Sequence, residues 1–469
     1  MFLISLYLRP MNATKYILLI LVLFLVQGAV KSQSAENFKL LHHWKVDSLQ
    51  GSFLYDNTYN EIWGITNKGR EYAVIGSTYG THFIDVTDPA SFGEVDAVQG
   101  AFSNRLVVHR DYKDYKGYIY AVCDEGFVND NSTLQIIDYA TLPDSVHVVY
   151  DTSEYIRKSH NIFIDTSSAR LYAAGSYGLV ILSIEDPIKP KFIGLYSDIG
   201  VHDLYVRRDT AYLNNGEDMR IVDFTDPMNG KQLYILKDYP EKGYNHNGWL
   251  NGKGDTYLFT DETKGTRVKV CSVSDLSNFE IVSYIQPKYS DSSIAHNVVI
   301  KEDVAYISYY NDGLQVFDIS NPKSPVRVGY YNSGNYDTFA PYMGVWGVYP
   351  FLPSGKILYS NMQKGLYVIE PSRGYVLGTE KIPVQTFGVE VYPNPIQDQL
   401  NVSLNLEQNK EVLFEVFNLQ GIKIRTLLSK PLTKGKHDLQ FDFGNEYSPS
   451  LYLLQIIVGE KKEVFKLIK

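Results

Sequence analysis

The sequence predicts an all-β protein, built as a seven-bladed β-propeller followed by a small Ig-like β-sandwich. One phrase recurs seven times through the middle of the 469-residue chain, with steps of 42 to 51 residues. A regular step of this size is typical of propellers and related repeat architectures. Tyrosine occurs 38 times, and with Val, Ile and Phe it suits the half-buried surface of a pleated sheet. No part of this region keeps a helical period of 3.6 residues.

The first 32 residues are predicted to be a signal peptide. Lys15 precedes the apolar run YILLILVLFLVQGAV, and the expected cleavage point follows Ser32. A run of about 15 residues is short for a bilayer span, and it has the flanks of a secretory signal. Translation from Met1 or from Met11 leaves a complete signal in either case. We expect export through the inner membrane and no transmembrane anchor.

Each repeat begins with a histidine or a tryptophan followed by an apolar run. An aromatic strand, a β-branched run with a turn and a short last strand follow, as in RLYAAGS, LVILSIEDP and PKFIGLY. Four short strands bounded by turn residues are expected to form one blade. The seven starting residues are Trp63, His109, His160, His202, His246, His296 and Trp346.

The propeller is expected to span residues 38–371 and to be closed by its own N-terminal strand. The seventh repeat supplies only three strands before it ends at Pro371, and a spare strand, FKLLHHWKV, precedes the first repeat. Pairing of this strand with the last blade would cover an edge that an open ring leaves exposed.

Strand direction predicts that the repeated histidines gather at one end of the propeller. The second strand of a blade runs antiparallel to the first, so its end returns to the rim where the first strand starts. The face expected to bind a ligand comprises Trp63, His109, Asp124, Glu125, His160, Asn161, His202, Asp203, His246, Asn247, Trp249, Asp261, Glu262, His296, Asn297 and Trp346.

Two interpretations of this face remain open. In the first, the His, Asn and Asp side chains are structural and bond the backbone between blades. In the second, neutral imidazoles with carboxylate neighbours bind a divalent metal such as zinc. Neither HExxH nor a Cys-x-x-Cys pair occurs, so the cofactor stays unknown. The candidate metal ligands are His109, His160, His202, His246 and His296.

The function expected from these features is binding of a ligand, an ion or a partner at the histidine-lined face. One alternative is a metal-dependent hydrolase, for which His246, Asp261 and Glu262 are the strongest catalytic group. Another is a structural surface protein without a small ligand. The GxSxG and GxxxxGK motifs are missing. Catalysis is therefore undecided, and a protein without enzymatic activity is favoured. A net charge of −9 without a basic patch argues against nucleic acid as a partner.

Residues 387–469 are predicted to form a second domain after a linker at 372–386. Strand-like runs alternate with Asn-Pro and Gln-Gly turns in YPNPIQDQLNVSL and FNLQGIKI. This alternation predicts a small β-sandwich.

Both domains resemble known families. The phrases IVDFTDP and VFDISNP resemble LVIVD repeats, and YAVIGSTYGTHFIDVTDP, HNGWL and GVWGVYPFLPSGKILYSN resemble the choice-of-anchor B proteins of Bacteroidetes. YPNP and FNLQG resemble the type A C-terminal sorting domain of the type IX secretion system, with Ser450 where that family usually has Gly. The first resemblance implies an exported propeller without a known reaction.

The second resemblance implies a partner and a destination. The partner is the type IX secretion machinery, which reads the C-terminal domain as an address and removes it during export. The destination is the outer cell surface or the medium. The surface ligand stays open among a glycan, a peptide and another protein.

Overall fold

The computed structural model describes residues 34–126, 132–334, 342–372, 389–393, 396, 398–418, 423–443, 451–459 and 461–469. The chain divides into two compact units, Met1–Leu377 and Gly378–Lys469, each of which is described by itself. The signal peptide predicted at 1–32 and nearly all of the linker predicted at 372–386 lie outside the described residues. Within the described ranges, no helix has the length and apolar character needed to span a membrane.

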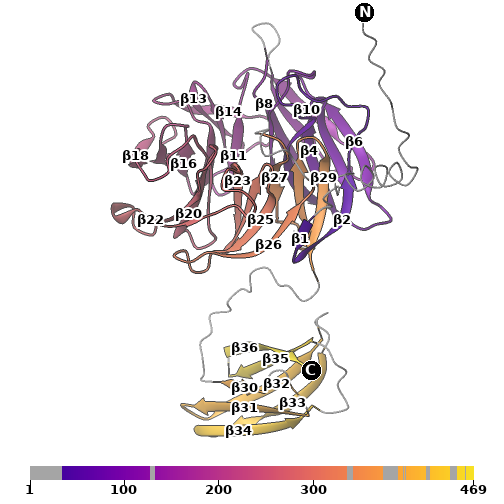
Figure 1. Ribbon diagram of the computed structural model, residues 1–469, viewed down its shortest axis with the longest axis vertical. Coiled ribbons are helices and arrows are strands. Elements are labelled where there is room, and N and C mark those ends of the chain that lie inside the picture. Colours follow the sequence, from indigo (N-terminus) through magenta and orange to yellow (C-terminus); the bar gives the residue numbers. More distant parts are fainter. Residues whose placement is uncertain are drawn as a thin grey trace, which may run out of the picture. The chain divides into compact units, whose positions relative to one another are not determined.

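The N-terminal unit is a propeller of seven antiparallel sheets, which confirms the predicted fold class (Figure 1). The inner strand of each blade contacts the inner strand of the next, and that of the seventh contacts that of the first. The circle is therefore closed around one axis.

The first four blades each take four consecutive strands. Their bounds are β3 (Tyr59–Asn67), β4 (Arg70–Ser77), β5 (Gly80–Asp85) and β6 (Gly93–Gln99); β7 (Arg110–Tyr115), β8 (Tyr118–Cys123), β9 (Leu134–Asp138) and β10 (His147–Thr152); β11 (Asn161–Asp165), β12 (Arg170–Gly175), β13 (Gly178–Ser183) and β14 (Lys191–Tyr196); and β15 (Asp203–Arg207), β16 (Thr210–Asn214), β17 (Met219–Asp223) and β18 (Lys231–Leu236).

The fifth blade also takes four consecutive strands, and the sixth and seventh blades each include one of the two strands at the N-terminal end of the unit. Their bounds are β19 (Asn245–Leu250), β20 (Thr256–Asp261), β21 (Val268–Ser272), the 3-10 turn η1 (Leu276–Asn278) and β22 (Glu280–Ile285); β23 (Ala295–Lys301), β24 (Val304–Tyr309), β25 (Gly313–Asp318), β26 (Val326–Asn332) and the added β1 (Ser34–Glu36); and β27 (Val345–Tyr349), β28 (Ile357–Asn361), β29 (Gly365–Pro371) and β2 (Phe38–Trp44).

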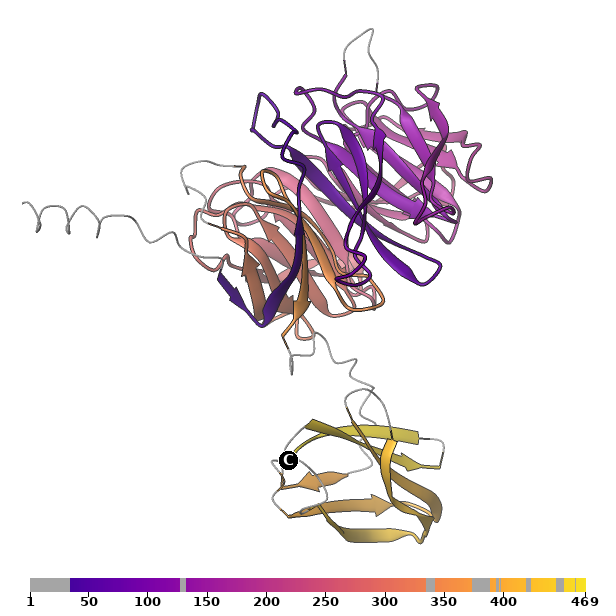
Figure 2. The same cartoon turned by 90° about the vertical axis from the view of Figure 1, so that its right-hand side faces the viewer.

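The seventh blade combines strands from the two ends of the repeat region. β2 pairs antiparallel with β29, with Phe38 opposite Pro371 and Trp44 opposite Leu366. Figure 2 shows the indigo N-terminal strands beside the orange strands that end this unit. Phe38 is 4% exposed and packs among residues of the sixth and seventh blades. The first strand thus covers an edge and contributes to the core.

Tyrosine fills much of the space between the blades. Nine of the twelve largest fully buried side chains are tyrosines, for example Tyr72, Tyr112 and Tyr257. A phenol ring buries a large apolar area and still offers a hydroxyl for bonding across blades. Tyr257, for example, donates to Asn214 over 2.8 Å. This packing explains why the sequence uses tyrosine so heavily.

The C-terminal unit is a sandwich of two antiparallel sheets. One has the order β30-β31-β34 and the other the order β33-β32-β35-β36. Buried side chains from both sheets, including Val402, Phe414 and Leu454, form one core. The strands are β30 (Glu390–Tyr392), β31 (Gln399–Leu406), β32 (Lys410–Phe417), β33 (Lys423–Leu432), β34 (Gly435–Asp442), β35 (Leu451–Val458) and β36 (Lys461–Ile468).

Candidate functional site

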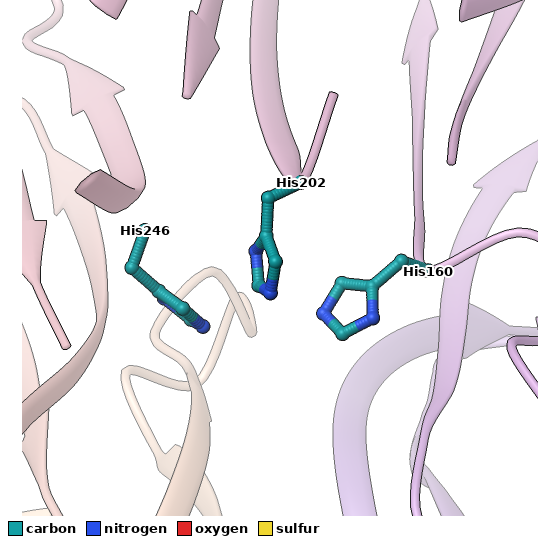
Figure 3. A group of neighbouring side chains, drawn as sticks. All are labelled: His160, His202 and His246. Carbon is teal, nitrogen blue, oxygen red and sulfur yellow. The ribbon is translucent and has the colours of Figure 1, made fainter. Parts of the chain in front are cut away.

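Six aromatic rings close a circle at one end of the propeller axis. Five are imidazoles and the sixth is the indole of Trp346, and each stands at or just before the start of an inner strand. Centroids of neighbouring rings are 3.9 Å apart for His160 and His202 and 5.4 Å apart for Trp346 and His109. Figure 3 shows three of the imidazoles converging. The imidazole ring, as we call this circle, consists of His109, His160, His202, His246, His296 and Trp346.

Two of these histidines are held by the backbone of the neighbouring blade. The Nδ1 atom of His246 lies 3.1 Å from the carbonyl oxygen of His296, and the Nδ1 atom of His296 lies 2.7 Å from that of Trp346. A carbonyl can only accept, so each Nδ1 carries the proton and each Nε2 keeps its lone pair. Burial lowers the pKa of His296 to about 3 and that of His246 well below its usual value. Both imidazoles are therefore neutral at pH 7.

Two other histidines are held by carboxylates. Glu125 lies 2.6 Å from the Nδ1 of His109, and Asp124 lies 2.8 Å from the Nδ1 of His160. Burial alone would raise the pKa of each carboxyl group, but the hydrogen bond to its histidine and the other interactions with the neighbouring histidines together outweigh burial and lower the pKa. Both carboxylates directly follow β8, which returns to this rim as strand direction requires.

Glu262 reaches the imidazole ring from the end of β20. Its Oε2 lies 3.8 Å from the Nε2 of His246, and the hydroxyl of Tyr310 donates to its Oε1. Burial raises the pKa of Glu262 to about 7. No lysine or arginine pairs with this carboxylate among the described residues. A buried carboxylate without a cation is costly unless it is protonated or finds a positive partner.

Three groups of side chains at this rim could hold a metal ion. Within each group the potential ligand atoms lie within 4.8 Å of one another. The groups are His109, Asp124 and His160; His160, His202 and His246; and His246, Glu262 and His296. The second group shares His160 with the first and His246 with the third.

A polar set lies directly beside the imidazole ring and lines a cavity of about 20 Å³ with it. Asp111, held by Lys113 at 3.0 Å, accepts from the backbone of Ile162. Burial raises the pKa of Glu61, and Asp111 adds to that rise. Burial would raise the pKa of Asp203 as well, but the neighbouring histidines, His202 first, hold it well below its usual value. The members are Glu61, Asp111, Asn161, Asp203 and Asn297.

The sequence pattern identified three members of this polar set and missed Glu61 and Asp111. In four blades an Asn or Asp directly follows the histidine, which is a readable signal. Glu61 and Asp111 bond to other blades as these residues do. Glu61 accepts from Asn297 over 3.2 Å, and Asp111 accepts from the backbone of Ile162 as Asn247 does from Val298. Both depart from the pattern of a histidine followed directly by Asn or Asp. Glu61 is a glutamate, and Asp111 is separated from His109 by Arg110. Inspection of the first repeat for any acid at this place would have found Glu61.

The expectation that Trp63 and Trp249 lie at the rim is wrong. The same one-residue register shift precedes Ile62 in β3 and Val348 in β27, so the counterpart of Trp346 is Asn60, and Trp63 lies three residues further along its strand. Its indole packs at 4.9 Å against Tyr349 and donates to Asp114. Trp249 comes three residues after His246 and packs 4.9 Å from Tyr205. At the first blade Asn60 takes the rim position, and its amide donates to the backbone of Val108.

The expectation that Asp261 belongs to the binding face is also wrong. Its carboxylate is 2.5 Å from the ammonium of Lys269, and both side chains are fully buried. It also accepts from the hydroxyl of Tyr239 over 2.8 Å. Neighbouring residues of a strand point to opposite faces, so Glu262 faces the histidines and Asp261 does not.

Asn247 lies next to the imidazole ring and links blades. Its amide nitrogen donates to Asp203 over 2.9 Å and its oxygen accepts from the backbone of Val298. The remaining predicted residues, Asn161 and Asn297, each bury a side-chain oxygen that has no hydrogen-bond partner within the described residues.

Comparison with known proteins identifies the C-terminal unit and one blade. Residues 390–469 match the family model of the secretion system C-terminal sorting domain. The tail therefore implies export, with the protein secreted or held at the outer surface, and contact with the secretion machinery. Residues 293–333, which make up the sixth blade, match the LVIVD repeat.

Two further comparisons concern whole chains. A search of the curated proteins found no match. A crystal structure of a protein from Lactobacillus plantarum is similar with a TM-score of 0.47 and 10% identity, and the match covers 87% of this chain and 99% of that chain.

Proposed function

We propose that this protein is an exported surface propeller that binds a divalent transition metal ion at the imidazole ring. The observation that carries the proposal is the group of His246, Glu262 and His296. Both Nδ1 atoms are occupied by carbonyl oxygens, so both Nε2 lone pairs are available to an ion. Neutral histidines bind without first losing a proton, and the metal supplies the positive charge that Glu262 lacks.

The donor set favours zinc or a similar borderline ion. Two imidazole nitrogens and one carboxylate oxygen are a frequent set for Zn²⁺, whereas Ca²⁺ and Mg²⁺ prefer oxygen alone. The hydrogen bonds to the three ligand side chains also suit a metal site. Carbonyl groups orient both histidines, and the Tyr310 hydroxyl orients Glu262. Such outer partners fix the tautomer and the direction of each ligand.

Metal-dependent hydrolysis is the second candidate, and one observation favours it. The group supplies three protein ligands, and catalytic zinc sites commonly use three protein ligands and leave a fourth position to water or substrate. Hydrolysis of 4-nitrophenyl acetate by the zinc-loaded full chain, compared with chelator-treated protein, tests this candidate. An equal rate in both samples rejects it.

Delivery to the outside follows from both ends of the chain. The C-terminal domain supplies the address for the secretion machinery, and the segment at 1–32 acts as the signal for the inner membrane. The repeats have the character of the choice-of-anchor B proteins of Bacteroidetes, for which the attachment device and not the propeller varies.

Metal titration of the full chain tests the proposed function. After chelator treatment, zinc binding is measured by calorimetry and the bound metal by elemental analysis. We expect tight binding to the native chain and a large loss of affinity in His246→Gln and in His296→Gln. The control is His147→Gln, since His147 is exposed on the outer strand β10 and lies outside the imidazole ring. Unchanged affinity in both ring variants contradicts the proposal.

A further inference from the structure

A cleft of about 680 Å³ opens beside the imidazole ring, between the segment that precedes β11 and the face of the third blade. A volume in this range is typical of sites for small organic molecules. Its wall includes Asp124, which also holds His160 in the imidazole ring. The cleft and the ring therefore meet at one side chain.

The floor of the cleft is apolar and partly open to solvent. Ala173 lies opposite Val180, and Val180 lies opposite Leu195, so the three form a row across β12, β13 and β14. Leu195 is 46% exposed, and Tyr177, at the turn between β12 and β13, is 94% exposed. A large ring held this far into solvent gains little from the fold itself. It is available to pack against an apolar part of a ligand.

Two cationic side chains of the cleft wall are free to bind an acidic group. Arg157 and Lys158 are both exposed, and within the described residues neither side chain has a hydrogen-bonded or ion-paired partner. The wall also carries two carboxylates, and each has a hydrogen-bond donor of its own: the hydroxyl of Tyr155 for Glu154 and the imidazole of His160 for Asp124. No described carboxylate therefore pairs with Arg157 or Lys158.

We infer that this cleft binds a small amphipathic anion, with an apolar or aromatic body on the Ala173–Val180–Leu195 row and an acidic group at Arg157 and Lys158. Guanidinium and ammonium groups are the usual partners of carboxylate, sulfonate and phosphate groups. Binding in the cleft does not depend on a metal. The further statement that the cleft lies at the same rim as a bound metal ion rests on the proposed function.

Fluorescence titration with 8-anilinonaphthalene-1-sulfonate tests the inference, because this probe joins an aromatic body to one acidic group. The full chain is treated with chelator first, so no metal contributes. We expect saturable binding of one probe per chain, and a Kd at least about 10-fold higher for N-phenyl-1-naphthylamine, the same body without the sulfonate.

Substitutions locate the binding. The double variant R157Q/K158Q is expected to raise the Kd of the sulfonate probe about 10-fold or more, and Tyr177→Ala to raise it several-fold. Tyr177 is so exposed that its removal leaves the fold intact. The control is K237Q/K242Q, which removes two exposed lysines of the fourth blade and the following loop and is expected to leave the Kd unchanged.

The possible outcomes separate this inference from the proposed function. Probe binding that is non-saturable, or that is equal in native protein and R157Q/K158Q, overturns the inference. Zinc titration of R157Q/K158Q is expected to match that of the native chain. A chain that binds the probe as described but never binds zinc retains the cleft and rejects the metal. A chain that binds zinc but not the probe retains the metal site and overturns the inference about the cleft.

Discussion

The Nδ1 atom of His296 lies 2.7 Å from the main-chain oxygen of Trp346, so the chemistry of one blade is set by the backbone of the next. The same relationship recurs between His246 and His296 at 3.1 Å. Each hydrogen bond fixes a tautomer and leaves one nitrogen lone pair free. Propeller closure and the proposed metal site are thereby coupled, because a displaced blade would release the histidine of its neighbour.

Acid should destabilise the metal-free protein through His296. In the folded state the pKa of His296 is about 3, below its ordinary value of 6.5. Between pH 6.5 and pH 3 His296 is protonated in the unfolded chain but not in the folded protein, so the free energy of unfolding falls as the pH drops toward 3. The loss approaches about 1.4 kcal/mol per pH unit for one such histidine.

Urea unfolding of chelator-treated protein between pH 4 and 7 measures this effect. The difference in unfolding free energy between His296→Gln and native protein should shrink or reverse on going to acid, because Gln does not titrate. The exposed-site control His147→Gln should follow the native curve. Parallel curves for native protein and His296→Gln would show that His296 is not a neutral buried group.

The ion pair of Lys269 and Asp261 should stabilise the fold without affecting the binding of zinc. Lys269→Met leaves the buried carboxylate of Asp261 uncompensated, which typically costs about 3–5 kcal/mol. Lys253→Met, which breaks an exposed pair with Asp303, should cost about 1 kcal/mol or less. Thermal unfolding compares the two. The zinc content of folded Lys269→Met should equal that of native protein. A selective loss of zinc would indicate that Asp261 belongs to the binding site after all.

The closing strand should contribute strongly to stability. Phe38 lies in β2, far in sequence from the blades against which it packs. Phe38→Ala is expected to reduce the free energy of unfolding by about 3–5 kcal/mol, through lost burial and the cavity that remains. Lys39→Ala, a change at a half-exposed neighbour, serves as the control. Equal denaturation midpoints for the two variants would mean that β2 is only loosely attached.

The Tyr310 hydroxyl should tune metal affinity from outside the ligand set. Tyr310 is 1% exposed and donates to Glu262, so Tyr310→Phe removes the orienting bond while keeping the ring. Loss of an outer partner typically reduces metal affinity by about 10–100-fold. Tyr120→Phe, which removes a hydroxyl bonded to the backbone of Pro187, is the matched control. Identical zinc affinities in calorimetry for both variants would argue against Glu262 as a ligand.

The number of blades could be predicted from the sequence because each blade repeats a local pattern of strands and turns. The convergence of the five histidines followed from strand direction alone. The position of Trp63 was predicted wrongly because both the first and the last repeat contain a tryptophan, and the register shows that Asn60 is the counterpart of Trp346. Asp261 and Glu262 are neighbours with the same charge, and only the register of β20 decides which one faces the axis.

The tautomers of the histidines and the hydrogen-bond partners of the candidate ligands could not be predicted from the sequence. The partner of His296 is a carbonyl oxygen, and every residue supplies one, so no residue type signals it. The cleft at Tyr177 likewise depends on how the segment before β11 lies against the third blade. Sequence patterns identify the blade and its strands but not the space between two blades.

We propose that His246, Glu262 and His296 hold a divalent metal ion, and anomalous diffraction at the zinc absorption edge, from crystals of the full chain grown with zinc, locates that ion. We expect a peak bonded to the Nε2 atoms of His246 and His296 and to a carboxylate oxygen of Glu262. A map with no peak within the imidazole ring, or with zinc only on exposed histidines such as His147, would contradict it.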